Sequence, residues 1–329
     1  MLSLCGKVFH MVQNKDCLRK MPVVALLAFL CCVLWGSAFS GVKRSYTLLH
    51  IGTDDWADQL VFGGIRFLLA GLMVLVFGSI SAGRALIPSK SSISKICVIG
   101  FFQTVLQYFC YYIGLAHTTG VKASVLVGTN VFLAILISSL LLRLERLTVQ
   151  KVIGSAVGFL GIILINLKGL SQESGFSFLG DGLILLCTVA SGFSSAFMKK
   201  LSANENPVLL SGWQFFGGGA VLALIGFAFG GHIPRFDLPS GLLLIYLAFI
   251  SAAAYSIWAV LLKHNPVSKV SVFGFLNPLC GVLISAAVLR ESNQITLLFL
   301  LSLLLVCAGI VIVNANAHDS ELPRRSSEK

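Results

Sequence analysis

The chain contains an internal repeat, and this feature limits its possible folds more than any other. Residues 107–143 resemble residues 254–290 when the sequence is shifted by 147 positions. The polar matches are Tyr108 with Tyr255, His117 with His264, Lys122 with Lys269, Asn130 with Asn277 and Arg143 with Arg290. Matched Leu and Val mean little in an apolar chain, but polar matches at one spacing indicate a duplication.

The composition is that of a membrane protein. Of 329 residues, 57% are hydrophobic and only 11% are charged, with a mean hydropathy of +0.92. A soluble domain carries about 25% charged residues. Apolar runs of about 20 residues, each long enough to cross a hydrocarbon core of about 30 Å, recur along the sequence. We therefore expect an all-α polytopic membrane protein.

Charge and cysteine placement exclude other classes. The net charge of +11 comes from basic residues in the gaps between apolar runs, which does not favour a nucleic-acid partner. Most of the nine cysteines lie inside apolar runs and none forms a C-x-x-C pair, so we interpret them as small buried hydrophobic residues. No hydrolase, phosphate-binding or zinc-binding motif is present. We expect no enzyme, no cofactor and no metal site.

The apolar runs predict ten transmembrane helices. Their ranges are 22–41, 59–79, 96–115, 121–142, 152–167, 182–198, 209–229, 241–262, 270–289 and 297–313. The predicted organisation is an N-terminal tail (1–21), a first five-helix repeat (22–168), a linker (169–180), a second five-helix repeat (181–316) and a C-terminal tail (317–329).

The other helices repeat in the same order at slightly shifted spacings. Gly36 matches Gly192, and Phe67 matches Phe215. Because each repeat has an odd number of helices, the second copy enters the membrane from the opposite side. The two copies are then related by a pseudo-two-fold axis in the membrane plane, an arrangement that recurs in secondary transporters.

Lys and Arg residues predict the orientation. With a cytoplasmic N-terminus, the cytoplasmic segments carry most of the basic residues, and the opposite side carries few. The predicted outer loop 52–58 holds Asp54, Asp55 and Asp58. Both termini should therefore be cytoplasmic, in what we expect to be a bacterial plasma membrane.

Several short motifs resemble the drug/metabolite transporter superfamily, in its ten-helix EamA-type branch. They are residues 35–39 (WGSAF), 66–71 (RFLLAG), 112–116 (YIGLA) and 145–148 (ERLT), with Asn277-Pro278 and Leu289-Arg290-Glu291 in the second repeat. The resemblance extends over nearly all of residues 22–314. The fourth helix has Asn130-Val131 where such families often have a proline, and the first helix lacks the glutamate of small four-helix exporters.

This resemblance implies a function. Such families export amino acids, metabolites or drugs, usually coupled to ions, through a cavity built mainly from the first, third, fourth, sixth, eighth and ninth helices. The expected partners are a small-molecule substrate, the lipid bilayer and H⁺ or Na⁺ as the coupling ion, in a monomer or a homodimer.

Two predicted helix faces are candidates for a binding site. Gln103, Gln107 and Tyr111 recur every four residues on the third helix, so their side chains share one face. Tyr255 and Trp258 form the counterpart on the eighth helix. Polar groups in hydrocarbon need partners, so these faces either line a cavity or form interhelical bonds.

Three further residues complete the predicted substrate site. Asn130 and Asn277 are matched by the repeat, and Pro278 should disturb the ninth helix beside Asn277. Close packing around a kink is the alternative for these asparagines. Trp35 lies in the middle of the first helix, which argues against a tryptophan at the membrane interface, although packing is again an alternative.

The charged residues near helix ends can be explained by structural roles, without a role in transport. Glu145 and Glu291 stand before the fifth and tenth helices and Asp181 before the sixth, where carboxylates stabilise helix N-termini. Arg66 lies about 10 Å deep if its helix starts at residue 59, within reach of snorkelling. We favour a structural role for Arg66, with anion recognition as the alternative.

The sequence thus favours a secondary transporter, an exporter of a small organic metabolite or amino acid that works by alternating access. A passive facilitator of the same fold is the first alternative, because no buried acid offers an obvious proton carrier. A membrane-embedded enzyme or a sensor is the second. The amide and aromatic groups favour a neutral, zwitterionic or partly aromatic substrate.

Overall fold

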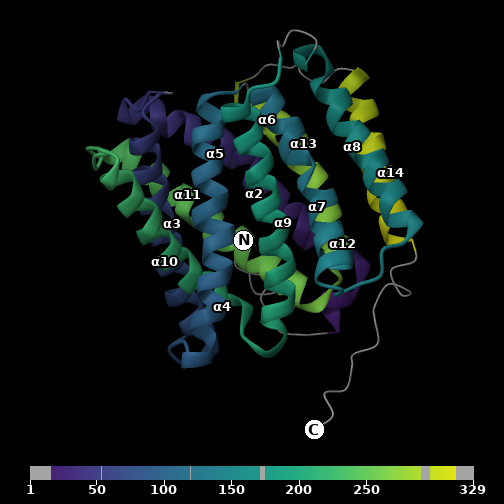
Figure 1. Ribbon diagram of the computed structural model, residues 1–329, viewed down its shortest axis with the longest axis horizontal. Coiled ribbons are helices and arrows are strands. Elements are labelled where there is room, and N and C mark those ends of the chain that lie inside the picture. The colour runs from purple at the N-terminus through teal and green to yellow at the C-terminus, as the bar shows by residue number, and fades with distance from the viewer. Residues whose placement is uncertain (1–15, 53, 119, 171–174, 290–296, 316–329) are drawn as a thin grey trace.

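In a computed structural model of the protein, the described residues (16–52, 54–118, 120–170, 175–289 and 297–315) form helices and contain no strand (Figure 1). The α-helices are α2 (Met21–Leu49), α3 (Trp56–Ala82), α4 (Lys90–Gly100), α5 (Gln107–Ala116), α6 (Gly120–Gly128), α7 (Asn130–Leu136), α8 (Val149–Leu170), α9 (Leu183–Leu201), α10 (Pro207–Ala228), α11 (Leu238–His264), α12 (Val267–Ser271), α13 (Leu276–Leu289) and α14 (Leu297–Asn314). Short 3-10 or π turns are η1 (Cys17–Arg19), η2 (Phe101–Leu106), η3 (Ile137–Leu141), η4 (Phe178–Gly182), η5 (Ser202–Asn204) and η6 (Val272–Phe275). The predicted tail 317–329 lies wholly, and the tail 1–21 largely, outside the described residues. Of the predicted linker 169–180, only residues 171–174 lie outside them; α8 continues to Leu170 and η4 begins at Phe178.

Nine of the helices in the described part of the chain are long and apolar enough to cross a membrane, so the protein is an all-α polytopic membrane protein. The fourth predicted helix, 121–142, departs from the expectation. A turn at Thr129 separates α6 from α7, and α7 continues into η3. The apolar part of this segment, Val125–Leu141, is shorter than the nine candidate membrane spans. The Thr129 hydroxyl donates to the Leu126 carbonyl at 2.6 Å, and such local bonds bend helices.

The first helix is longer than predicted. It was expected to end at Gly41 but continues to Leu49, where His50 takes a left-handed conformation with φ of 54°. Nothing between Gly41 and His50 breaks a helix, and the pair Lys43-Arg44, which suggests a helix end, is simply part of α2. The extension places the Tyr46 ring 5.6 Å from the Phe62 ring.

Two pairs of helices flank the molecule, and each joins matched helices of the two repeats. α3 runs beside α10, and α8 runs beside α14 (Figure 1). A Cβ atom placed on Gly64 would lie 2.7 Å from the Gly219 carbonyl, and one on Gly71 would lie 2.8 Å from the Gly212 carbonyl. Contacts therefore move down α10 as they move up α3, so the pair is antiparallel. Glycine permits this close approach of two backbones.

The α8–α14 pair has the same construction. A Cβ atom on Gly154 would lie 2.9 Å from the Gly309 carbonyl, and one on Gly161 would lie 2.8 Å from the Ser302 carbonyl. These helices are the fifth of each repeat, as α3 and α10 are the second. Antiparallel contact between equivalent helices is what an inverted repeat produces.

The first helix of each repeat crosses the fourth helical segment of the other. A Cβ atom on Gly36 of α2 would lie 2.8 Å from the backbone nitrogen of Gly281, and one on Gly192 of α9 would lie 3.2 Å from that of Ala134. The repeat matches Gly36 with Gly192, and the 147-residue shift matches Ala134 with Gly281. Two independent positions thus obey the same pseudo-two-fold relation.

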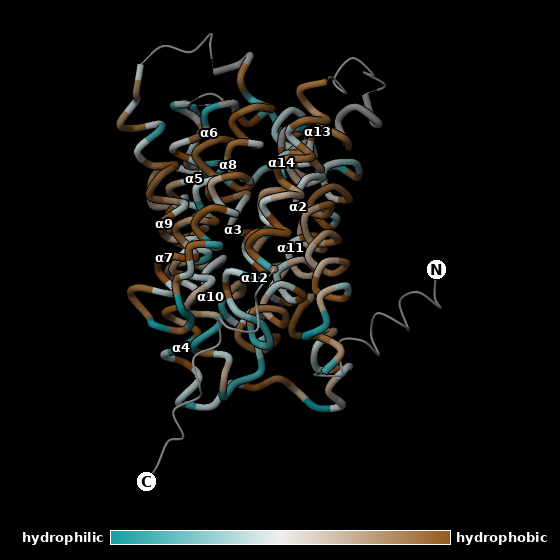
Figure 2. The backbone as a smooth tube through the Cα atoms, turned by 90° about the vertical axis from the view of Figure 1, so that its right-hand side faces the viewer, coloured by the Kyte–Doolittle hydropathy of each residue, from teal (hydrophilic) through white to brown (hydrophobic). Residues whose placement is uncertain are grey.

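Apolar and hydrophilic residues are distributed along the helices as expected for a membrane protein. Figure 2 shows apolar residues over most of the length of the helices, with the most hydrophilic segments near the end where α4 begins. Many large apolar side chains on the outside are exposed, among them Phe77, Leu224 and Leu304. Such a surface is suited to lipid contact.

Candidate functional site

Four aromatic side chains meet where the two repeats face each other. Ring centroids lie 4.3 Å apart for Phe67 and Tyr108 and 5.1 Å apart for Phe215 and Tyr255. Phe67 stacks on Phe215 at 5.3 Å, and the hydroxyls of Tyr108 and Tyr255 are hydrogen-bonded at 2.8 Å. These four residues are called the central quartet. Each contact within one repeat has its counterpart in the other.

The pseudo-two-fold relation between the repeats implies that the central quartet lies at half depth in a membrane. A two-fold axis in the membrane plane carries a residue at one depth to the mirrored depth on the other side of the midplane. A residue and its match in the other repeat therefore have the same depth only at the midplane, and only there can they lie side by side. Phe67 touches its match Phe215, and Tyr108 touches its match Tyr255, so the axis and the midplane pass between them.

Two tryptophans extend the quartet on one side only. The Trp35 ring lies 5.0 Å from Tyr255 and 5.1 Å from Trp258, both in edge-on geometry. Trp35 of α2 corresponds to Ser191 of α9, and Trp258 corresponds to Tyr111. The indole Nε1 of Trp35 is buried and has no hydrogen-bond partner among the described residues. The structure thus brings the predicted Trp35, Tyr255 and Trp258 together.

The predicted face of the third helix reaches the same place. Gln107 lies near the Tyr255 hydroxyl, and its own Oε1 is buried without a hydrogen-bond partner among the described residues. The Tyr111 ring lies 6.3 Å from Tyr108. Gln103 is only 6% exposed, and its Oε1 also has no partner in the described part of the chain. Unpaired buried polar atoms are rare in folded proteins and call for an explanation.

Asn130 and Asn277 stand apart from these rings. Phe132 of α7 approaches Phe275 of η6 at 6.4 Å, and Gly274 lies against Val131, so the two asparagines flank the crossing of the fourth and ninth segments. Both Oδ1 atoms are buried and unpartnered among the described residues. Within the described ranges, no ring contact or hydrogen bond joins either asparagine to the central quartet.

The ninth predicted helix is irregular next to Pro278, as expected. The irregular stretch is η6, which ends at Phe275, and α13 begins at Leu276. Pro278 therefore falls in the first turn of α13, where a missing N–H costs little. The disturbance lies on the N-terminal side of Asn277, in η6, which contains Gly274, the residue whose carbonyl the missing N–H of Pro278 would otherwise bind.

Arg66 does not snorkel. Because α3 begins at Trp56 and not at Gln59, Arg66 lies deeper than predicted, beside Phe67 of the central quartet. It is 5% exposed, with Nη2 donating to the Ser251 hydroxyl at 2.9 Å and Nε to the Leu247 carbonyl at 3.3 Å. Its guanidinium also lies 5.3 Å from the Phe67 ring centre.

No carboxylate of a described residue lies within 4.0 Å of this guanidinium. A charged Arg at the centre of a membrane helix costs about 2.5–3.5 kcal/mol on insertion scales. Ser251 and Leu247 offer the guanidinium neutral acceptors and no negative charge. Arg66 is thus a buried cation without a counter-charge in the described part of the protein.

Two residues near Arg66 were absent from the predicted site. The hydroxyls of Tyr46 and Tyr112 are buried and make no hydrogen bond of normal geometry in the described part of the chain, and both side chains pack in one cluster with Phe67, the neighbour of Arg66. Tyr46 was missed because α2 was predicted to end before it. Tyr112 shares a helix with Tyr111, and only its 2% exposure distinguishes it as an inward-facing residue.

Contrary to the prediction from the sequence, Glu145 does not cap the fifth helix but binds the first turn of α12. α8 begins at Val149, and the buried Glu145 carboxylate instead receives a 2.7 Å contact from Lys151 Nζ. It also accepts from the Ser138 hydroxyl at 2.7 Å and the Ser268 amide at 3.0 Å. This buried ion pair joins the end of the fourth segment to α12 of the second repeat.

Asp181 fits its predicted place at the start of a helix. It lies in η4 and accepts from the Ser177 amide at 2.9 Å and from the Thr118 hydroxyl, with Lys122 3.8 Å away. The third such residue in the sequence, Glu291, lies outside the described residues. Among the described residues, no group of three His, Cys, Asp or Glu side chains is placed to hold a metal ion.

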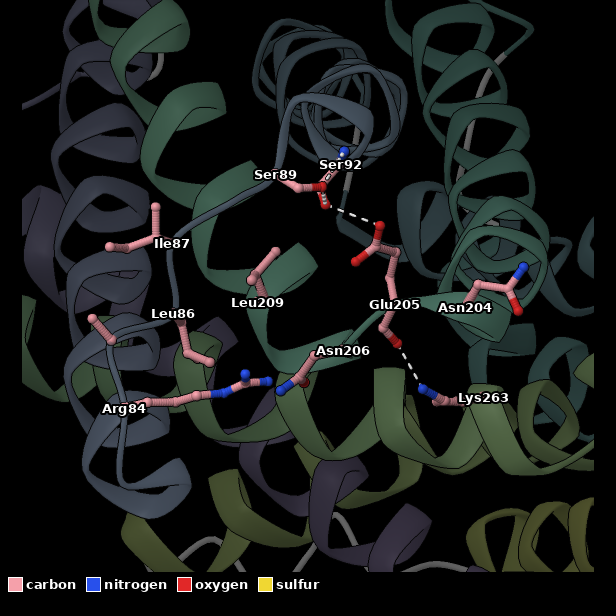
Figure 3. Close-up of a pocket in the computed structure, with 11 residues that line it drawn as sticks. Arg84, Leu86, Ile87, Ser89, Ser92, Asn204, Glu205, Asn206, Leu209 and Lys263 are labelled. Atoms are coloured by element: carbon pink, nitrogen blue, oxygen red, sulfur yellow. Dashed lines mark hydrogen bonds between the residues drawn. The ribbon is translucent and has the colours of Figure 1, made fainter.

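A separate polar pocket of about 340 Å³ lies at the end of the molecule where α4 begins (Figure 3). Glu205 lines it and binds Ser92 at 2.9 Å and Lys95 at 2.8 Å, while its carbonyl accepts from Lys263 at 2.6 Å. The Lys95 ammonium holds the pKa of the Glu205 carboxyl below its ordinary value of 4.5, despite opposing desolvation. None of the predicted site residues lines this pocket.

Comparison with known proteins agrees with this architecture. A model of the EamA-like transporter family matches twice, over residues 23–167 and 178–315. The chain is 25% identical to an uncharacterized transporter of Archaeoglobus fulgidus over 90% of its length and 99% of the relative. It is 27% identical to the uncharacterized transporter YvbV of Bacillus subtilis, covering 91% of this chain and 94% of that one.

Two further similarities cover most of the chain. The uncharacterized inner membrane transporter YedA of Escherichia coli K12 is 25% identical over 79% of this chain and 81% of its own length. One solved crystal structure has the same fold, with a TM-score of 0.74 at 16% identity, covering 90% of this chain and 98% of the other. With nearly its whole length matched by the family model, this membrane protein belongs to the EamA-like transporter family.

Proposed function

We propose that the protein is a secondary transporter that exports a small organic metabolite or amino acid by alternating access. Its two halves, residues 22–168 and 181–316, would rock about the pseudo-two-fold axis and expose the centre to each side in turn. Both termini would be cytoplasmic, in a bacterial plasma membrane. The substrate would bind beside Trp35, Gln103, Gln107, Tyr111, Asn130, Tyr255, Trp258 and Asn277.

One observation carries this proposal. Unpartnered buried polar atoms gather near half depth, among them Trp35 Nε1, Gln103 Oε1 and Gln107 Oε1. A polar atom left unpaired in a membrane interior is costly. A substrate that supplied donors and acceptors at half depth would remove that cost, and a packing role alone would not require the unpaired atoms.

The test is transport by purified protein in proteoliposomes. A thermal-shift screen of amino acids, nucleosides and cationic drugs first identifies ligands, which raise the apparent unfolding temperature. For a ligand that is transported, Gln107→Ala and Trp258→Ala should each reduce the initial rate by about tenfold or more, the effect of losing about 1.4 kcal/mol of binding. Gly217→Ala is the control, because a Cβ atom there meets nothing within 4 Å. Normal transport by both site variants would refute the site.

A passive facilitator of the same fold is the second candidate. It is favoured by the positions of Glu145, Asp181 and Glu205, which are engaged by partners at the ends of helices rather than at the central quartet. A proton-coupled carrier usually needs an ionisable group along its pathway. Transport that only dissipates a substrate gradient, and ignores imposed pH and Na⁺ gradients, would favour the facilitator. Accumulation driven by either gradient would exclude it.

A further inference from the structure

The second repeat provides an internal control for Arg66. The repeat matches Arg66 with Gln214 and Ser251 with Thr104. In the first case, Arg66 Nη2 donates to the Ser251 hydroxyl at 2.9 Å, and in the second the Thr104 hydroxyl donates to Gln214 Oε1 at 2.6 Å. The two hydrogen bonds join matched positions, although the second-helix residue donates in one and accepts in the other. Each ties the second helix of one repeat to the third helical segment of the other, α3 to α11 and α10 to η2.

Comparison with Gln214 shows which property of Arg66 the hydrogen bond between helices needs and which it does not. Gln214 is buried, at 1% exposure, and makes the equivalent interhelical bond with an uncharged amide. A glutamine at position 66 would therefore suffice to join α3 to α11. The positive charge is additional to what packing requires, and buried charge that packing does not require is a sign of function.

Unsatisfied donors surround this charge. Nε and Nη2 are engaged by Leu247 and Ser251, and no described acceptor binds Nη1. The Tyr112 hydroxyl lies 3.0 Å from where a Cβ atom on Gly63 would stand, three residues before Arg66 on α3, and the Tyr46 ring packs 5.6 Å from Phe62 on the same helix. Both hydroxyls are buried, and neither makes a hydrogen bond of normal geometry within the described ranges. A guanidinium flanked by phenolic hydroxyls offers the directed donors that a carboxylate accepts.

We propose that the Arg66 guanidinium, with the hydroxyls of Tyr46 and Tyr112, binds the carboxylate of the transported substrate. This deepens the proposed function and rests on it, because it assigns the substrate class to organic monocarboxylates, amino acids included. A carboxylate is favoured over a phosphate because no second cationic side chain contacts the described cluster, so the site offers one positive charge. The rings of the adjacent quartet favour an aromatic or apolar remainder.

The experiment compares matched ligands that differ only in charge. The affinities of purified full-length protein are measured for phenylacetate, phenylacetamide, L-phenylalanine, L-phenylalaninamide and inorganic phosphate. For at least one couple, the wild type should bind the carboxylate about tenfold or more tightly than the amide, the effect expected for a charge-assisted bond. Arg66→Gln should abolish this preference, and Arg66→Lys should retain part of it. Gln214→Leu, which alters the matched position of the other repeat, should leave it intact.

A structural role for the charge predicts a different result. If the charge held the fold together, Arg66→Gln would lower the unfolding temperature, whereas the proposal expects that temperature to stay equal or rise. Should the variant not fold, Tyr46→Phe and Tyr112→Phe provide the same test, since each removes a hydroxyl and should weaken carboxylate binding but not amide binding.

Several outcomes would overturn the proposal. They are equal affinity for carboxylates and amides, tighter binding of phosphate than of any carboxylate, absence of binding by all carboxylates, and a preference that survives Arg66→Gln. Failure of the proposed function looks different: the carboxylate binds with the expected preference, but proteoliposomes do not transport it. Transport of amides and carboxylates at equal rates would refute only the carboxylate site.

Discussion

Gly36 and Gly192 occupy matched positions in the two repeats, as do Arg66 and Gln214, but only the glycines have kept the same chemistry. Each glycine admits the backbone of the fourth segment of the other half. The second pair keeps its hydrogen bond and differs in charge. The glycine pair that docks the halves is thus equal in both repeats, whereas the pair at positions 66 and 214, next to the proposed site, differs in charge.

The aromatic residues show the same division. The central quartet is symmetric, since both halves contribute one Phe and one Tyr in equivalent contacts. Beyond it, the side of α2 and α11 carries Trp35 and Trp258, and the side of α9 and α5 carries Ser191 and Tyr111. A substrate is asymmetric, so a site that binds it at a two-fold axis must depart from the symmetry of the scaffold.

The largest effect is expected from making the two halves equal in charge. Gln214→Arg would place a second buried guanidinium opposite Thr104, and we expect a loss of about 2.5–3.5 kcal/mol of folding free energy. Arg66→Gln, the opposite change, should cost nothing or stabilise the protein. The measurement is unfolding in detergent at neutral pH. If both variants were equally destabilised, the charge of Arg66 would belong to the scaffold.

The next effect tests whether docking is symmetric. Gly71→Ala and Gly219→Ala alter matched glycines of the α3–α10 pair, where a Cβ atom would lie 2.8 Å from the Gly212 and Gly64 carbonyls, respectively. Overpacking of this kind costs about 1–3 kcal/mol, and the two losses should agree. Gly217→Ala on the same helix has free space and should be neutral or slightly stabilising. Clearly unequal losses would contradict the pseudo-two-fold relation at this interface.

A smaller effect separates scaffold from site within the quartet. Tyr108→Phe and Tyr255→Phe each break the same 2.8 Å hydrogen bond, so each should cost a similar amount, about 0.6–1.7 kcal/mol. Their effects on transport should differ, because the Tyr255 hydroxyl also lies near Gln107 of the proposed site. We expect the larger loss of transport for Tyr255→Phe, measured as an initial rate in proteoliposomes. Equal losses of transport would argue that both hydroxyls act only through their mutual bond.

Much of this arrangement is predictable from the sequence. The shift of 147 residues by itself pairs Tyr108 with Tyr255, and the spacing of polar residues singles out Gln107 and Trp258. Contact between matched residues is not predictable in this way, since it depends on how the halves dock. The docking is set by glycine contacts between residues far apart in the chain, such as Gly64 with Gly219.

The misplaced residues have physical causes as well. Lys43-Arg44 resembles a membrane boundary, so α2 was ended before Tyr46 although no residue there disfavours a helix. Glu145 was assigned to a helix end by proximity, whereas its partner Lys151 lies one turn inside α8. Both errors arise because hydropathy locates helices but not the ion pairs and extensions at their ends.

The smallest predicted effect is a pH dependence of stability, which should be found for Glu205 at the end of the molecule but not for Arg66 beside the central quartet. Lys95 and Ser92 lower the pKa of Glu205 below 4.5, so the folded state binds this proton less readily than the unfolded state. The resulting stabilisation is fully present above pH 4.5 and is lost as the pH falls through the lowered pKa. Because the pair is partly exposed, at 25% for Lys95 and 16% for Glu205, it should contribute only about 0.2–1 kcal/mol.

The check is the unfolding temperature of wild type and Glu205→Gln between pH 7 and pH 3. Comparing the two proteins cancels the titration of the other carboxyls. The variant should be less stable at pH 7, and the difference should shrink as the pH falls. Over the same range Arg66→Gln should differ from wild type by a constant amount, because neither a guanidinium nor an amide changes its charge there. A Glu205→Gln difference that persisted at pH 3 would show that this carboxyl acts through packing and not through its charge.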